Sequence, residues 1–177
     1  LRCSFLFGNA YGLCHPTAFF RGDMLRKYGI RYDENLPTAQ DYGMWTTCAE
    51  YGEIANLEEV LLYYRVHNRQ ISVAKKELQK KCTAYTQQRL LRHIMPEITE
   101  EEIAMHFTFC NTSLVSKQMK RWFARIAAEN EKCGFVDSQA LSAFMKEFLR
   151  EKMTSAAKTV ISPGKIIKLM WAADAEQ

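Results

Sequence analysis

The stretch Asp41-Tyr42-Gly43-Met44-Trp45 places one carboxylate among aromatic and apolar residues. Thr38 stands three residues before Asp41, and this T-x-x-D spacing predicts a helix that begins there and runs through Trp45. Two further segments with polar residues flank it in the chain, one from His15 to Arg21 and one from Tyr64 to Ser72. We expect the three segments to converge on one site.

The first 73 residues, which contain these segments, have mixed α/β character. Glycine follows Tyr28 and Tyr51, as expected where helices end, because glycine accepts the left-handed conformation that other residues resist. Val60 to Val66 is a run of branched and aromatic residues with the composition of a buried strand. We therefore expect an α/β domain over residues 1–73.

Beyond Ser72 the sequence predicts helices alone. Thr99 to Glu102 is a capping box, a strong signal for a helix start. Ser162-Pro163 offers a cap followed by proline at the first helical position, which predicts one more helix. Two apolar stripes at helical spacing lie between these starts: Met119, Trp122, Phe123 and Ile126, and then Leu141, Phe144, Met145, Phe148 and Leu149.

The first of these two stripes ends near Gly134, and Asp137 caps the second. The segment from Ala74 to Met95 is less regular, and we expect it to bridge the two halves of the chain. The sequence thus predicts an all-α helical domain over residues 74–177 and an α-rich molecule.

The composition limits the classes of protein to which the chain can belong. At 177 residues, with hydrophobic residues at 47% and charged residues at 25%, the chain has the composition of a folded domain with a sizeable core. No apolar run approaches the roughly 20 residues that span a bilayer. Because it starts without methionine, within what looks like a structured segment, we expect the chain to be a piece of a longer protein.

The charge distribution and the cysteine spacing argue against nucleic-acid binding, disulfide bonds and a cysteine metal site. Residues 1–73 hold 7 Lys+Arg against 8 Asp+Glu, and residues 74–177 hold 17 against 12, too modest an excess to predict nucleic-acid binding. The 6 cysteines form no C-x-x-C pair, which favours free buried thiols. His106 and Cys110 share a helix face, but two ligands make a poor metal site, so we expect packed positions.

Several motifs in one register carry a resemblance to a known family. These are His15-Pro16, Phe20-Arg21, Gln40-Asp41-Tyr42-Gly43-Met44-Trp45, Asn56-Leu57-Glu58-Glu59-Val60-Leu61, and Tyr64-Arg65-Val66-His67 through Ser72. In this order they resemble the acceptor-side portion of a family 2 glycosyltransferase of the GT-A fold. The resemblance covers about the first 72 residues, and the helical remainder adds nothing to it.

The resemblance implies roles for individual residues. Asp41 corresponds to the catalytic base that takes the proton of the acceptor hydroxyl. Arg65 and His67 correspond to the segment near the donor diphosphate, and His67 would also ligate a divalent metal, Mn²⁺ or Mg²⁺. Five further residues would line or support the acceptor site: His15, Arg21, Gln40, Trp45 and Ser72.

Each of these roles has a structural alternative. Asp41 could serve only the first turn of its own helix, and spacing alone favours that reading. Arg65 could pair with Glu58 or Glu59, and His67 could be an exposed loop histidine. Trp45 is expected to pack in the core, and Arg21 is expected to support the Asp41 loop through an ion pair.

The chain departs from the family pattern at two places. Gly43 and Gln40 occupy positions that are often acidic, which leaves the acceptor preference open. The chain also contains no Asp-x-Asp, the motif that binds the metal and the donor phosphates in the family. We therefore expect the isolated chain to be inactive.

The leading hypothesis is a fragment of an inverting, metal-dependent glycosyltransferase that acts in cell-surface glycan assembly. The resemblance implies a nucleotide-sugar donor, a glycan or lipid-linked acceptor, and a cytoplasmic location with peripheral contact at the inner membrane face, and the modest charge excess predicts no nucleic-acid partner. The alternative hypothesis is a non-catalytic interaction module whose helices bind a protein partner. Methionines on or near the apolar stripes would supply its binding face: Met119, Met145, Met153 and Met170.

Overall fold

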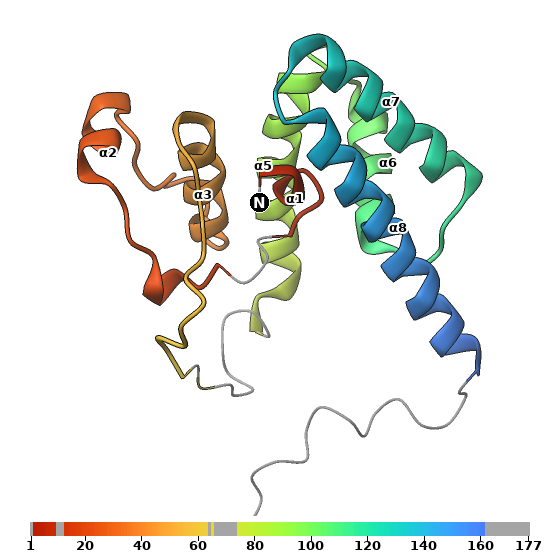
Figure 1. Ribbon diagram of the computed structural model, residues 1–177, viewed down its shortest axis with the longest axis horizontal. Coiled ribbons are helices and arrows are strands. Elements are labelled where there is room, and N and C mark those ends of the chain that lie inside the picture. Colours follow the sequence, from red (N-terminus) through yellow and green to blue (C-terminus); the bar gives the residue numbers. More distant parts are fainter. Residues whose placement is uncertain (1, 10–12, 64, 66–73, 162–177) are drawn as a thin grey trace, which may run out of the picture.

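The computed structural model describes residues 2–9, 13–63, 65 and 74–161, with side chains through residue 154. Its elements follow one another along the chain as helices joined by irregular segments (Figure 1). In order they are α1 (Arg2–Phe5), the 3₁₀ turn η1 (His15–Thr17), α2 (Gly22–Tyr28), α3 (Gln40–Tyr51), α5 (Lys76–Ile94), α6 (Glu100–Asn111), α7 (Lys117–Cys133) and α8 (Ser138–Ile161).

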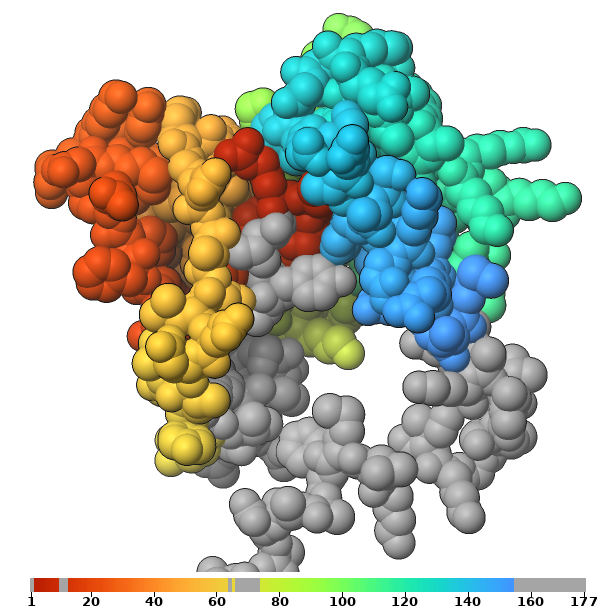
Figure 2. Space-filling view, viewed as in Figure 1, coloured from red at the N-terminus to blue at the C-terminus, as the bar shows by residue number. Residues whose placement is uncertain are grey.

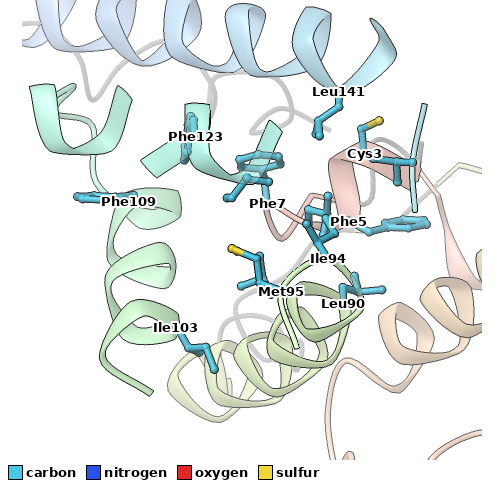
Figure 3. Packing of buried hydrophobic residues seen from close by; sticks show 14 of the residues in the cluster. Cys3, Phe5, Phe7, Leu90, Ile94, Met95, Ile103, Phe109, Phe123 and Leu141 are labelled. Atoms are coloured by element: carbon cyan, nitrogen blue, oxygen red, sulfur yellow. The ribbon is translucent and has the colours of Figure 1, made fainter. Parts of the chain in front are cut away.

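The short helix α1 and the two residues after it occupy the centre of the molecule. Phe5, Leu6 and Phe7 are each less than 5% exposed, at 1%, 0% and 4%. Figure 3 shows Phe5 and Phe7 surrounded by apolar side chains from α5, α6, α7 and α8. The helix α5 packs against α3 on one side and against α6 and α7 on the other, so the prediction that residues 74–95 bridge the two halves is confirmed.

Polar side chains from three helices satisfy the backbone of this central segment. The hydroxyl of Tyr42 donates to the carbonyl of Phe5. His106 Nε2 lies 2.8 Å from the carbonyl oxygen of Leu6, and Gln87 Nε2 lies 3.0 Å from the same oxygen. Because a four-residue helix makes few hydrogen bonds of its own, these side chains add to the turn bond from the N–H of Gly8 to the carbonyl of Phe5 and supply a donor for Leu6.

Local signals at the helix ends behave as the sequence predicts. The capping box is formed, since Thr99 Oγ1 accepts from the backbone N–H of Glu102 while the Glu102 carboxylate accepts from the N–H of Thr99. Asp137 Oδ1 accepts from the N–H of Ala140 at 2.7 Å and caps α8. Gly29 and Gly134 adopt the left-handed conformation after α2 and α7, with φ of 63° and 64°.

The start and end of α3 are built differently from the prediction. The N-cap is Ala39, in the left-handed region at φ 55°, and Thr38 is buried with its hydroxyl directed at Cys82 Sγ. The helix does end at Tyr51, but Gly52 is fully extended instead of left-handed. The helix predicted after Ser162 lies outside the described residues.

The predicted α/β fold is wrong. Within residues 2–9, 13–63, 65 and 74–161 the structure contains helices and no β-strand, so there is no α/β half of a GT-A domain. The apolar run that begins at Val60 was expected to be a buried strand, yet Val60, Leu61 and Tyr63 are 77%, 62% and 95% exposed. A strand requires neighbouring backbone to pair with, and no described segment offers that edge to residues 60–63.

No helix within the described residues combines the length and the apolarity that are needed to cross a bilayer.

Candidate functional site

An open cleft of about 1240 Å³ lies beside the carboxyl-terminal half of α3. One wall is formed by η1 and α2, and the other by the extended residues 53–62. These residues run alongside α3 (Figure 1). Trp45 lies at its base and Phe19, which is fully exposed, at its rim. The lining carries positive charge from Arg21 and Lys27 and negative charge from Asp23, Glu53 and Glu59, so the cleft combines apolar and polar surface.

A second, smaller apolar cluster supports the wall formed by α2. Ile30, Met44 and Cys48 are buried in it, and Met24 and Phe20 pack against them. Burial raises the pKa of the Cys48 thiol, so this cysteine stays protonated and is not a reactive nucleophile of the cleft.

His15 lies close to the cleft and is fixed by aromatic residues. Its Nε2 lies 2.8 Å from the hydroxyl of Tyr32, and its ring meets the ring of Trp45 edge to face at 6.5 Å. Trp45 is 6% exposed and belongs to the main core, so the prediction that it packs there is confirmed. Sequence reasoning missed Tyr32, because a tyrosine in an irregular segment gives no periodic signal.

Asp41 lies in the first turn of α3, outside the set of residues that line the cleft. Its Oδ1 accepts from the backbone N–H of Tyr42 at 2.8 Å, which agrees with a role in the first helical turn. Oδ2 has no hydrogen-bond donor among the described residues. Since residues four and seven apart share a helix face, Asp41 continues the face of Trp45 and Cys48 one turn beyond the cleft.

The other predicted site residues are only partly brought together. Arg21 is exposed at the start of α2 and lines the cleft, but it forms no ion pair with Asp41, although both residues are described. Gln40, the first residue of α3, is half-buried next to Asp41. Arg65 is exposed and forms no ion pair with the described Glu58 or Glu59.

His67 and Ser72 lie outside the described residues, so the structure does not place the pair Asp41 and His67. These assignments stay predictions.

Gly43 has a structural reason that the sequence did not reveal. A Cβ built on it would lie 2.5 Å from Leu36 Cδ1, so the side chain of residue 43 must be absent for Leu36 to pack. The next nearest atom is Thr86 Oγ1 at 4.0 Å, on α5, the helix against which α3 also packs. The departure from the family pattern at this position is therefore a packing requirement.

A polar cluster between α3 and α5 was not predicted from the sequence. Arg89 Nη2 donates to the hydroxyls of Thr46 and Thr47 at 3.0 and 2.9 Å. Glu50 Oε1 lies 3.5 Å from that nitrogen and 3.7 Å from His93 Nε2. Arg89 and His93 stand four residues apart on α5, a spacing that places two nitrogen-bearing side chains on one face and could have indicated the cluster.

The described residues do not fit a metal ion by themselves. No group of three or more His, Cys, Asp and Glu side chains comes together among them. His106 and Cys110 are packed in the core, as predicted, and the six cysteines are free thiols.

Comparison with known proteins finds no matching family model and no matching solved structure. The chain is 36% identical over 73 residues to an uncharacterized glycosyltransferase of Methanocaldococcus jannaschii, and the matched stretch covers 41% of this chain and 24% of the relative. It is 32% identical over 56 residues to an uncharacterized glycosyltransferase of Haemophilus influenzae, and that stretch covers 32% of this chain and 17% of the relative.

The chain thus matches about a quarter or less of the length of these curated relatives. Although partial, the two similarities support a relationship to glycosyltransferases.

Proposed function

We propose that this chain is the acceptor-side segment of an inverting, metal-dependent glycosyltransferase similar to family 2. The observation that carries the proposal is the similarity over part of the chain to two glycosyltransferases. The open cleft beside Trp45 and the ordered motifs from His15 to Ser72 support the same conclusion. The described part is helical, so the proposal includes no α/β domain.

Asp41 is the general base of the proposed reaction. In an inverting transfer, a carboxylate takes the proton of the acceptor hydroxyl while its oxygen attacks the anomeric carbon from the side opposite the leaving nucleotide. Oδ1 of Asp41 is held by the N–H of Tyr42, which orients the carboxylate, and Oδ2 faces no donor among the described residues. The acceptor sugar would lie along the face shared with Trp45, in the adjoining cleft.

The donor is a nucleotide sugar whose diphosphate is bound by Arg65 and His67. An exposed guanidinium such as that of Arg65 can pair with the phosphate charge that develops on the leaving group. The divalent metal, Mn²⁺ or Mg²⁺, would need His67 and ligands beyond the described residues, because these hold no suitable cluster. Since the chain has no Asp-x-Asp, we expect no transfer by the isolated chain.

The acceptor is a hydroxyl of a glycan or of a lipid-linked carrier in cell-surface glycan assembly, and the reaction takes place in the cytoplasm. Phe19, which is fully exposed, gives the cleft flat apolar surface next to charged groups, and Trp45 closes its base. Sugar rings present the same combination of apolar faces and hydroxyl edges, which makes the cleft a suitable place for the acceptor.

The alternative, a helical interaction module, receives little support from the methionines. Met119 and Met145 are buried in the core at 0% and 7% exposure, and Met153 is exposed. Met170 lies outside the described residues. Core methionines fill space between helices and offer no binding face.

The proposal is tested with the full-length protein in a screen of nucleotide-sugar donors in the presence of Mn²⁺. Asp41→Asn should abolish transfer and leave donor binding and the melting temperature nearly unchanged, because it removes the proton acceptor but keeps the side-chain shape. The matched control is Asp33→Asn, which changes a carboxylate outside the cleft whose Oδ1 accepts from the N–H of Asn35, and it should retain transfer. Transfer that survives Asp41→Asn would refute the assignment of the base.

A second variant tests the donor side. His67→Ala should weaken metal-dependent donor binding, measured by calorimetry with Mn²⁺ present and absent. Donor affinity equal to that of the unmodified protein would remove His67 from the site.

A further inference from the structure

The connection between α6 and α7 presents an apolar side chain next to a group of cations. Leu114 lies in this connection and is 70% exposed. Three exposed basic residues follow within the first five residues of α7: Lys117, Lys120 and Arg121. Figure 2 shows that side chains in this part of the chain project from the right-hand edge of the molecule.

The connection has a defined conformation that holds Leu114 outward. Ser116 Oγ accepts from the N–H of Met119 and caps α7, and Thr112 Oγ1 accepts from the N–H of Leu114. Lys152 of α8 donates to the carbonyls of Cys110 and Thr112, which fixes the end of α6. With both ends of residues 112–116 tied down, the exposure of Leu114 is a feature of the fold.

The cations form one face and are not neutralised within the described part of the protein. Lys117, Lys120 and Arg121 are spaced i, i+3 and i+4, so they share a helix face, and none of them forms an ion pair with a described residue. By contrast, Arg125 on the next turn is paired with Glu102. The three positive charges lie within about 6 Å along the helix axis, less than the Debye length of about 10 Å at 0.1 M salt, and therefore act together.

This arrangement works against the stability of α7 itself. Like charges at i, i+3 and i+4 repel one another, and Lys117 in the first turn opposes the helix dipole. No acidic residue stands in the first turn of α7, whereas α6 begins with three glutamates. Contact with a surface that is negatively charged outside and apolar beneath would reduce the repulsion among the cations. It would also bury the exposed side chain of Leu114.

We propose that Leu114, Lys117, Lys120 and Arg121 form a docking surface for an anionic lipid bilayer. Leu114 inserts among the acyl chains just below the headgroups, and the three cations contact the lipid phosphates. The charge complementarity commits the surface to a lipid with a net negative headgroup. This proposal rests on the α6–α7 connection and stands whether or not the chain takes part in sugar transfer.

The test is sedimentation of the full chain with large vesicles of phosphatidylcholine alone or of equimolar phosphatidylcholine and phosphatidylglycerol. The protein should bind the anionic vesicles and stay in solution with the neutral ones. Raising the salt from roughly 0.1 M to 1 M should release it, because the Debye length falls from about 10 Å to about 3 Å. Equal binding to both vesicle types would overturn the proposal.

Two pairs of variants separate this surface from general attraction by positive charge. The double change Lys120→Gln and Arg121→Gln should lower the partition coefficient about 30-fold, since each cation contributes about fivefold. The matched control, Lys76→Gln and Lys81→Gln, removes the same charge from exposed positions of α5 and should change it less than about threefold. An equal loss in both double variants would overturn the proposal.

Leu114→Ser should lower binding roughly fivefold by removing the inserted side chain, while Leu57→Ser, at a residue 73% exposed, should have no effect. If Leu114→Ser binds vesicles normally and the protein binds single-stranded RNA more tightly than vesicles, the cations serve another polyanion and the lipid proposal fails.

Discussion

His106 is an ionisable side chain sealed inside the core, where its hydrogen bonds require the neutral form. It is 1% exposed, and the indole N–H of Trp122 donates to its Nδ1 at 3.0 Å while Nε2 lies 2.8 Å from the carbonyl of Leu6. Since Nδ1 accepts, the ring carries its proton on Nε2 and donates to Leu6. Burial lowers the pKa of His106 from 6.5 to about 4.

We predict that this histidine makes the protein less stable in acid. Between pH 6.5 and pH 4 the unfolded chain binds a proton at His106 that the folded chain excludes, so stability falls as the pH drops through this window and levels off below it. The loss amounts to about 3 kcal/mol over the window, at roughly 1.4 kcal/mol for each pKa unit. Urea unfolding of the full chain at a series of pH values measures it.

The control for this prediction is a pair of histidine variants. His106→Gln removes the titrating group and should flatten the pH profile in this window, at a lower overall stability. His93→Gln removes an exposed histidine of α5 by the same substitution but leaves His106 in place, so the fall in stability assigned to His106 should persist in it. A profile that His106→Gln does not alter would show that other groups cause the acid sensitivity.

Gly43 gives a second prediction at the level of a single residue. Gly43→Asp should destabilise the fold by about 3 kcal/mol or more, because the new Cβ would meet Leu36 Cδ1 and the carboxylate would be buried without a partner. The matched change Gly22→Asp introduces the same side chain in the first turn of α2, beside the guanidinium of Arg26, and should be neutral or stabilising. Chemical denaturation compares the two, and equal stabilities would contradict the packing role of Gly43.

At the scale of elements, one asparagine joins α7 to α8. Asn130 is fully buried, its Nδ2 donates to the carbonyl of Val136 at 2.8 Å, and its Oδ1 accepts from the N–H of the same residue at 3.0 Å. The amide side chain thus pairs with the turn as a neighbouring backbone would. It fixes the angle at which α8 leaves the turn and returns to the core.

Asn130→Ala should therefore destabilise the protein by about 2–4 kcal/mol, because it leaves the buried N–H and C=O of Val136 without partners. Asn111→Ala removes an exposed asparagine at the end of α6 and should change stability by less than about 0.5 kcal/mol. Thermal unfolding of both variants provides the comparison. A small effect of Asn130→Ala would mean that water replaces the lost hydrogen bonds.

The elements that the sequence predicts correctly are those with local causes. The capping box at Thr99, the cap at Asp137 and the left-handed glycines each depend on a few neighbouring residues. The failures are non-local. The run from Val60 onward has strand composition, but pairing depends on distant backbone, and the packing of Gly43 depends on Leu36 from an irregular segment.

The candidate site divides in the same way. The sequence identifies the residue types, and Trp45 and Arg21 do line one cleft. The arrangement of these residues around the cleft also depends on irregular parts of the chain, such as the one that contains Tyr32 and residues 53–62. Irregular segments have no periodic sequence pattern from which their positions could be predicted. The relation of Asp41 to His67 stays a prediction, because His67 is outside the described residues.

At the scale of the whole molecule, one apolar core connects residues from both sides of the predicted boundary at residue 73. Tyr42 and Trp45 of α3 belong to the same cluster as Leu91 of α5 and Trp122 of α7. The segment Phe5–Phe7 lies at its centre and packs against helices far along the chain. The centroid of the Phe7 ring lies 5.1 Å from the ring centroids of both Phe123 and Phe144. A core shared in this way favours a single cooperative unit over two independent domains.

We accordingly predict one unfolding transition for the chain. Variants that keep a single tryptophan, either Trp45 or Trp122, report on α3 and on α7 separately. In each variant the fluorescence midpoint in urea should coincide with the midpoint of helix loss by circular dichroism. Phe7→Ala should shift both midpoints together, by a destabilisation of about 3–5 kcal/mol, because it removes a ring of the first half that packs against Phe123 and Phe144 of the second. An earlier transition at Trp45, unaffected by Phe7→Ala, would instead establish two domains that meet near residue 73.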